Sequence, residues 1–151
     1  MPFLIGGVAL LAMVAAVVIS SRAPASIAPQ ASPYSPNLKL SDVKLSAAEN
    51  YVGGTVTYLD VNITNTGDRT LTGAQMRAVF KNSMGQVVQT ETLFLHVLVQ
   101  NQMAGYPDLV ELSRVPIGPG QTKTVRMTLD HISADWDNNP PEMQLVSLKL
   151  K

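Results

Sequence analysis

Residues 55–67 read TVTYLDVNITNTG, and this stretch decides the fold class of the chain. Its apolar side chains Leu59, Val61 and Ile63 alternate with residues of a different character. Alternation with a period of two is typical of a strand that has one face in the core and one in solvent. The Asn-Thr-Gly at its end predicts a turn, because Asn and Gly accept backbone angles that strands do not. The stretch therefore predicts a half-buried strand followed by a turn.

The same period recurs along the chain after Asn37. It predicts strands around residues 38–45 (with an interruption), 76–80, 125–129 and 146–150. Residues 86–99 predict two strands or one bent strand, and residues 108–115 a short edge strand. Turns or loops are expected at residues 50–54, 82–85, 101–107, 117–121 and 133–141. About seven strands of this kind predict an all-β fold, an antiparallel immunoglobulin-like β-sandwich over residues 38–151, with a small barrel as the alternative.

The N-terminal segment has a different character. Residues 3–19, FLIGGVALLAMVAAVVI, contain no charged, amide or hydroxyl side chain, and as a helix they span about 26 Å. This length predicts a transmembrane anchor over residues 1–21, in which residues 3–21 contact lipid. Ala12, Ala16 and Ser20 share one helical face and would let a second helix approach closely. The alternative is a signal peptide cleaved near Ala23-Pro24-Ala25.

A proline-rich linker is expected between the anchor and the sandwich. Residues 22–37 carry prolines at positions 24, 29, 33 and 36, which makes a semi-rigid spacer of up to about 50 Å. Arg22 directly after the apolar run would, by the positive-inside rule, keep the head in the cytoplasm. The linker and the sandwich instead favour an extracytoplasmic, periplasmic head, and this is the orientation that we expect.

Composition excludes several classes of function. The 151 residues contain 11 basic and 11 acidic side chains, so the chain lacks the positive surface that nucleic-acid binding requires. Cysteine is absent, which removes disulfides, thiolate metal ligands and a cysteine nucleophile. No serine lies in a G-x-S-x-G context, and the two histidines are far apart in the sequence. We therefore expect no enzyme, no catalytic residue and no cofactor.

Several short strings carry a family resemblance. They are Tyr58-Leu59-Asp60, Ile63-Thr64-Asn65-Thr66-Gly67, Val79-Phe80-Lys81-Asn82, Gly85-Gln86, Pro119-Gly120, Asp130-His131 and Asp135-Trp136. On these strings the chain resembles an uncharacterised bacterial family of membrane-anchored domains of unknown function, and its middle part resembles the FxLYD-like β-sandwich domain. The resemblance implies a membrane-tethered immunoglobulin-like domain without assigned chemistry. The chain departs from the pattern at residues 99–103, where relatives are expected to have a charged cluster.

One segment combines an imidazole with several carboxylates. In residues 129–137, LDHISADWD, His131 and Asp135 are feasible metal ligands, but their spacing matches no specific site. The simpler interpretation is structural, with both residues bonding the loop while Trp136 plugs the end of the sandwich. We therefore predict no metal here, and interpret His96 as an ordinary strand histidine.

The predicted interaction surface is the loop of residues 100–107, QNQMAGYP. Met103, Tyr106 and Pro107 offer adaptable contact chemistry on a rigid scaffold. The sequence thus predicts a single-pass membrane protein whose head is a non-catalytic accessory subunit of an envelope assembly, with a protein partner and room for oligomers. One alternative is a self-assembling, pilin-like filament subunit packed through its apolar helix. The other is a metal-binding or hydrolytic domain centred on His131.

Overall fold

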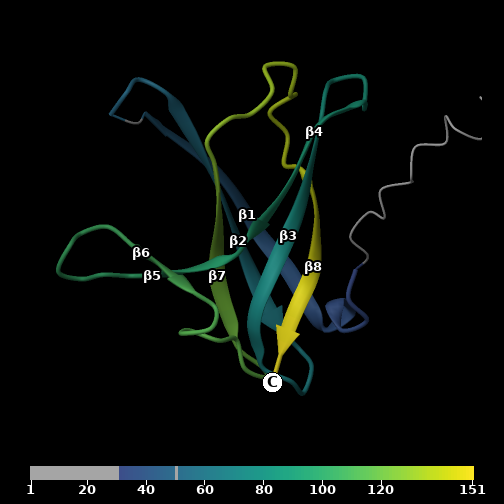
Figure 1. The fold of residues 1–151 in the computed structure, drawn as a ribbon, viewed down its shortest axis with the longest axis vertical. Coiled ribbons are helices and arrows are strands. Elements are labelled where there is room, and N and C mark those ends of the chain that lie inside the picture. The colour runs from purple at the N-terminus through teal and green to yellow at the C-terminus, as the bar shows by residue number, and fades with distance from the viewer. Residues whose placement is uncertain (1–30, 50) are drawn as a thin grey trace, which may run out of the picture.

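Two antiparallel sheets packed face to face form the domain (Figure 1). The computed structural model describes residues 31–49 and 51–151. The elements are η1 Ser35–Asn37, β1 Leu38–Glu49, β2 Thr55–Asn65, β3 Leu71–Lys81, β4 Val87–Phe94, β5 His96–Val99, β6 Asp108–Glu111, β7 Thr122–Leu129 and β8 Glu142–Leu150. One sheet has the order β1-β2-β7-β5-β6 and the other the order β4-β3-β8. The predicted all-β fold is confirmed.

The core lies between the inner faces of the two sheets. Leu59, Val61 and Ile63 of β2 have no exposed surface, so the predicted inward face of this strand is correct. Phe80 and Met76 of β3 face them from the other sheet and are also fully buried. Each such side chain contributes about 1.5–3 kcal/mol relative to exposure. The alternation in the sequence therefore sets which face of each sheet points inward.

The long run of residues 86–99 divides into two strands that belong to different sheets. β4 pairs with β3, whereas β5 pairs with β6 and β7. Leu95 lies between the two strands and is only 3% exposed, so the chain crosses from one sheet to the other through the core. This crossing explains why the run is apolar without a break.

β8 contains a bulge that its apolar pattern alone does not predict. Leu145 and Val146 are adjacent and both buried, which simple alternation forbids. Ser147 has a φ of 52°, and the pairing of β8 with β3 shifts register at this point. The extra residue restores the inward direction, so Leu148 and Leu150 continue the predicted stripe beyond the bulge.

Asn65, at the end of β2, is the polar centre of one end of the sandwich. It is fully buried, and its Nδ2 donates to the carbonyl oxygens of Arg69 (2.6 Å) and Ile117 (3.0 Å). Its Oδ1 accepts from the amide of Gly67 at 3.1 Å. Its main chain pairs with Gln121 and Gly120, at 2.9 and 2.7 Å. One side chain thereby joins β2, the β2–β3 turn and the segment before β7.

The segment before β1 docks onto this centre through Tyr34. The Tyr34 hydroxyl donates to Asn65 Oδ1 or the Arg69 carbonyl oxygen, each at 3.1 Å, and accepts from the Arg69 amide at 2.9 Å. Ala31 forms an antiparallel bridge with Val146 on β8. Gly67 is needed beside the ring, because a Cβ at this position would collide with the Tyr34 hydroxyl. Residues 31–37, within the predicted linker, thus contact the sandwich directly.

The predicted anchor of residues 1–21, including Ala12, Ala16 and Ser20, lies outside the described residues, as do linker residues 22–30. Within residues 31–49 and 51–151, no helix has the length and hydropathy to cross a bilayer.

We predict that Asn65→Asp destabilises the domain strongly, because a carboxylate cannot donate to the two carbonyl oxygens that Nδ2 contacts. The expected loss at neutral pH is about 2–4 kcal/mol of unfolding free energy, measured by urea denaturation. Tyr34→Phe removes only the hydroxyl and should lower the unfolding free energy by about 1 kcal/mol. An Asn65→Asp variant as stable as the parent chain would show that this centre is not structurally important.

Candidate functional site

β5 and β6 with their connecting loop form a hairpin arm, residues 96–111, that projects from the side of the sandwich (Figure 1). Only His96 and Val97 of β5 pair with β7. Beyond Val97 the two strands pair with each other alone, ending at Val99 and Asp108. The arm is therefore a two-stranded ribbon over most of its length.

The loop of the arm is organised by Asn101. Its Oδ1 accepts from the amides of Met103 and Ala104, both at 3.1 Å, and its Nδ2 donates to Asp108 Oδ2 at 2.9 Å. Gly105 follows with a φ of 74° and donates its amide to the Asn101 carbonyl oxygen. These bonds hold the loop in one conformation, in the manner of an Asx turn.

The structure places the three predicted contact residues together on this tip. Met103 is fully exposed and Tyr106 is 66% exposed, while Pro107 is half-buried beside them. Leu109 on β6 adds apolar surface and is 45% exposed. The tip and β6 thus expose three large apolar side chains to water, Met103, Tyr106 and Leu109.

A cavity of about 350 Å³ opens at the base of the arm. It exists because β4 ends at Phe94, opposite Gln75, so Thr72 and Gly73 of β3 have no partner on β4. Gly73 brings no side chain to fill the gap. The departure of the chain toward the other sheet therefore leaves a hollow between the two sheets.

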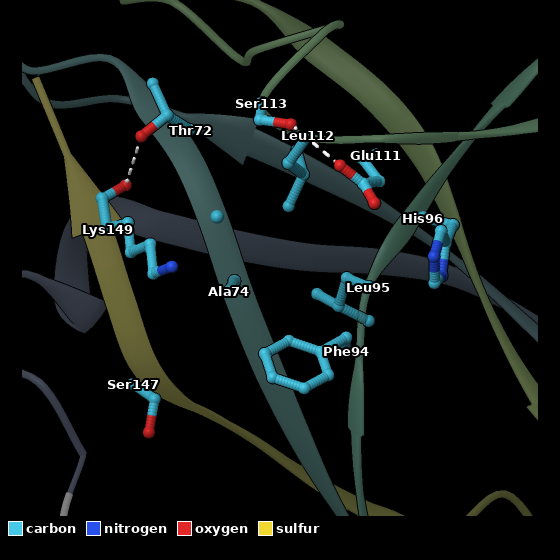
Figure 2. A pocket seen from close by; sticks show the side chains of 11 residues that line it. Thr72, Ala74, Phe94, Leu95, His96, Glu111, Leu112, Ser113, Ser147 and Lys149 are labelled. Carbon is cyan, nitrogen blue, oxygen red and sulfur yellow. Dashed lines mark hydrogen bonds between the residues drawn. The ribbon is translucent and has the colours of Figure 1, made fainter.

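Figure 2 shows the side chains that surround this cavity. Phe94, Leu95 and Ala74 supply apolar walls, and Phe94 is 65% exposed. The Ser113 hydroxyl donates to Glu111 Oε2 at 3.0 Å at one rim. Lys149 of β8 lies at another part of the rim. An apolar side chain with a nearby polar group fits such a hollow better than a charged ligand.

Trp136, which the sequence predicts to plug one end of the sandwich, lies in the β7–β8 loop. The Trp136 ring meets the Phe80 ring edge to face, with 5.5 Å between centroids, and its Nε1 donates to the Asn139 carbonyl oxygen at 3.0 Å. Gln89 of β4 holds the loop, since its Nε2 donates to the His131 carbonyl oxygen at 3.0 Å and its Oε1 accepts from the Ser133 amide at 2.7 Å. Trp136 thus links the loop to the core.

His131 and Asp135 take part in this loop through their main chains, and both residues are exposed. The neighbouring Asp137 carboxylate accepts bonds from the Asn139 side-chain and main-chain nitrogens, at 2.8 and 2.9 Å, which lower the pKa of Asp137. Within the described parts of the chain, no group of three or more acidic, histidine or cysteine side chains could hold a metal ion.

The outer face of the five-stranded sheet carries a row of charges that we call the charged row. It runs across all five strands through the register partners Lys44, Asp60, Arg126, His96 and Glu111. At its centre the Arg126 guanidinium binds Asp60 through two bonds of 2.6 and 2.8 Å and covers the Tyr58 ring at 4.5 Å. The bond to Asp60 raises the pKa of Arg126. Arg126 is therefore charged at every physiological pH.

Sequence reasoning found the loop but missed the side chains that organise its surroundings. The role of Asn101 could have been predicted from the sequence, because asparagine side chains often bond to the main chain of the turn that follows them. The cavity and the charged row could not have been predicted in this way, since both depend on which strands are neighbours and in which register they pair.

No protein-family model matches the chain, and no curated protein or solved structure matches it either.

We predict that Trp136→Ala lowers the unfolding free energy by about 2–4 kcal/mol, because it removes a half-buried ring packed on Phe80. The exposed side chains of His131 and Asp135 serve as controls, and their replacement by alanine should change stability by less than about 0.5 kcal/mol. Thermal and urea unfolding measure all three. If His131→Ala greatly lowered the unfolding free energy and Trp136→Ala did not change it, the assigned roles would be reversed.

Proposed function

We propose that this chain is a membrane-tethered, non-catalytic interaction module that binds a protein partner through the tip of its hairpin arm. The observation that carries the proposal is the exposed apolar surface of Met103, Tyr106 and Leu109 on a ribbon that stands away from the sandwich. Contiguous apolar surface of this kind on a soluble domain marks an interaction site. The module needs no cofactor for this role.

The build of the arm supports this proposal. A two-stranded ribbon is marginally stable in water by itself, and this one is joined to β7 by only two residues of β5. Beyond that point Leu98 and Leu109 face each other across the ribbon, and Leu109 is 45% exposed. A partner that covers the ribbon would remove this surface from water and stabilise it.

The tip also has the chemistry of a contact surface. Tyr106 offers a rigid ring with a polar hydroxyl, and Met103 offers a flexible side chain that adapts to irregular surfaces. Because Asn101 holds the loop in place before binding, little conformational entropy is lost when a partner docks.

We further propose that the sandwich is of the immunoglobulin-like type. Its strand order supports this, because β1-β2-β7-β5 matches the A-B-E-D sheet and β4-β3-β8 matches a C′-C-F sheet. Strand G has no counterpart among the described strands, and Ala31 pairs with β8 at the edge where G would lie. In this class of fold the loops and edges commonly bind partners.

The proposed tether is the apolar run of residues 3–21, with the head on the extracytoplasmic, periplasmic side. The described chain begins beside Tyr34, at the Asn65 end of the sandwich, whereas the turn between β3 and β4 lies at the opposite end (Figure 1). A tether at the Asn65 end leaves the arm free in the aqueous phase.

We predict that the double variant Met103→Ala/Tyr106→Ala loses its protein partners. Removal of two central contact residues is expected to weaken binding by at least about 30-fold. Cross-linking in intact cells followed by quantitative identification of neighbours measures the loss. The matched control is Tyr51→Ala/Met84→Ala, which removes the same side-chain types from two other exposed turns, where they are 110% and 75% exposed. If the control loses partners and the arm variant keeps them, the arm is the wrong surface.

We predict that the full-length chain stays in the membrane pellet after alkaline carbonate extraction, because residues 3–21 are held in lipid. N-terminal sequencing of the extracted protein should find Met1 or Pro2, not a residue after Ala25. Protease added to spheroplasts should remove the head if it is periplasmic. Recovery of the chain in the supernatant would contradict the anchor, and a protected head would contradict the orientation.

A further inference from the structure

Among the residues that the structure describes, both outer strands of the five-stranded sheet have a neighbour on one side alone. Within these residues β1 pairs with β2 only, and β6 pairs with β5 only. An edge strand presents unpaired main-chain groups that can accept another strand. The sheet therefore ends in two different edges, one at β1 and one at β6.

The charged row ends in opposite charges at these two edges. It runs from the Lys44 ammonium through Asp60, Arg126 and His96 to the Glu111 carboxylate, and both terminal residues are exposed. The Asp42 carboxylate accepts from Asn62 on β2 at 2.9 Å, and Lys44 is the β1 residue in register with Asp60. The row thus ends in a positive charge at β1 and a negative charge at β6.

The directions of the strands decide how two copies could meet. Each of the four neighbouring pairs from β1 to β6 is antiparallel, so β1 and β6 run in the same direction. A second copy displaced sideways along the sheet would place its β1 parallel to β6 of the first. Glu111 of one copy would then lie beside Lys44 of the next, so that opposite charges meet at the contact.

Pairing of two β6 edges is disfavoured. Two β6 strands related by a two-fold axis would bring Asp108 and Glu111 against the same residues of the other copy. Like charges on adjacent strands repel, whereas opposite charges attract. The β1 edge carries Lys39 and Lys44 together with Asp42 and Glu49, so charge does not decide the pairing of two β1 strands. Charge therefore favours the contact of Glu111 with Lys44 over a contact of two β6 edges.

We propose that copies of this chain associate edge to edge, with β6 of one copy beside β1 of the next and Glu111 paired with Lys44. Because the two surfaces differ, the contact does not close on itself and extends into a row of copies. β6 has four residues, so each contact is small and forms when copies are concentrated, as on a membrane surface. The contact uses the edge of the arm, not its tip, and stands independently of the partner proposed above.

The first experiment uses a zero-length carbodiimide cross-linker, which joins an amine to a carboxylate only when the two are in contact. Within one copy Lys44 and Glu111 lie at opposite edges of the sheet, roughly 19 Å apart, so a bond between them must join two copies. Full-length chain in nonionic detergent, mixed as isotope-labelled and unlabelled copies, should yield mixed-isotope Lys44–Glu111 peptides. The Lys81–Glu142 ion pair, at 2.5 Å, is the internal control for the reaction. A Lys81–Glu142 product without any Lys44–Glu111 product would overturn the proposal.

The second experiment exchanges the charges. Lys44→Glu makes both ends of the charged row negative and Glu111→Lys makes both ends positive, so each variant alone should lose the large species seen by sedimentation. An equimolar mixture should recover them, since each negative edge then meets a positive one. Recovery also proves that both variants are folded. Loss of the large species that mixing does not reverse, or no loss in either variant, would refute the charge-paired contact.

The tip variant separates this proposal from the partner-binding function. Met103→Ala/Tyr106→Ala should lose its protein partners and keep the Lys44–Glu111 product. Glu111→Lys alone should lose the large species seen by sedimentation and keep the partners. If the tip variant loses the cross-link, the copies associate through the tip, and the edge contact is wrong.

Discussion

The sandwich depends on the buried side-chain amide of Asn65. An amide can donate two hydrogen bonds and accept two, and Asn65 donates to two carbonyl oxygens and accepts from the Gly67 amide and the Tyr34 hydroxyl. The groups it bonds come from the segment before β1, the β2–β3 turn and the segment before β7. No apolar residue could join these three segments, because each offers main-chain polar groups that need partners when buried. The rest of this end of the domain is arranged around that requirement.

The surfaces used in the two proposals lie outside the packed part of the sandwich. Beyond Val97 the hairpin arm no longer pairs with β7, and its tip carries the exposed Met103. Where the five-stranded sheet ends, two unlike edges remain, which carry Lys44 and Glu111. Burial cannot explain the side chains at these places, because Met103, Glu111 and Lys44 contribute little to the core. Their exposure is compatible with roles in contact with other molecules, which is the basis of both proposals.

The sequence predicts the parts of the fold that depend on local alternation and little of what depends on neighbours. Leu59, Val61 and Ile63 are buried as predicted, because period-two patterning decides the inward face of a strand wherever it lies in the sheet. The bulge at Ser147 is not visible in the pattern, since a serine in a strand gives no signal of a positive φ. The loop with Met103 and Tyr106 could be predicted from its composition. The charged row could not, because Lys44 and Glu111 are joined only through the register of four strand pairs.

The arrangement of the chain ends has a mechanical consequence. Lys151 exchanges two main-chain bonds with Thr70, close to the Asn65 centre on which Tyr34 docks, so the described chain begins and ends near the same end of the sandwich. Tension applied through residues upstream of Ala31 reaches the Ala31–Val146 bridge and the Tyr34 hydroxyl before it reaches β1. A pull on the incoming chain therefore loads the short stretch around Tyr34 first and the strands of the sandwich only afterwards.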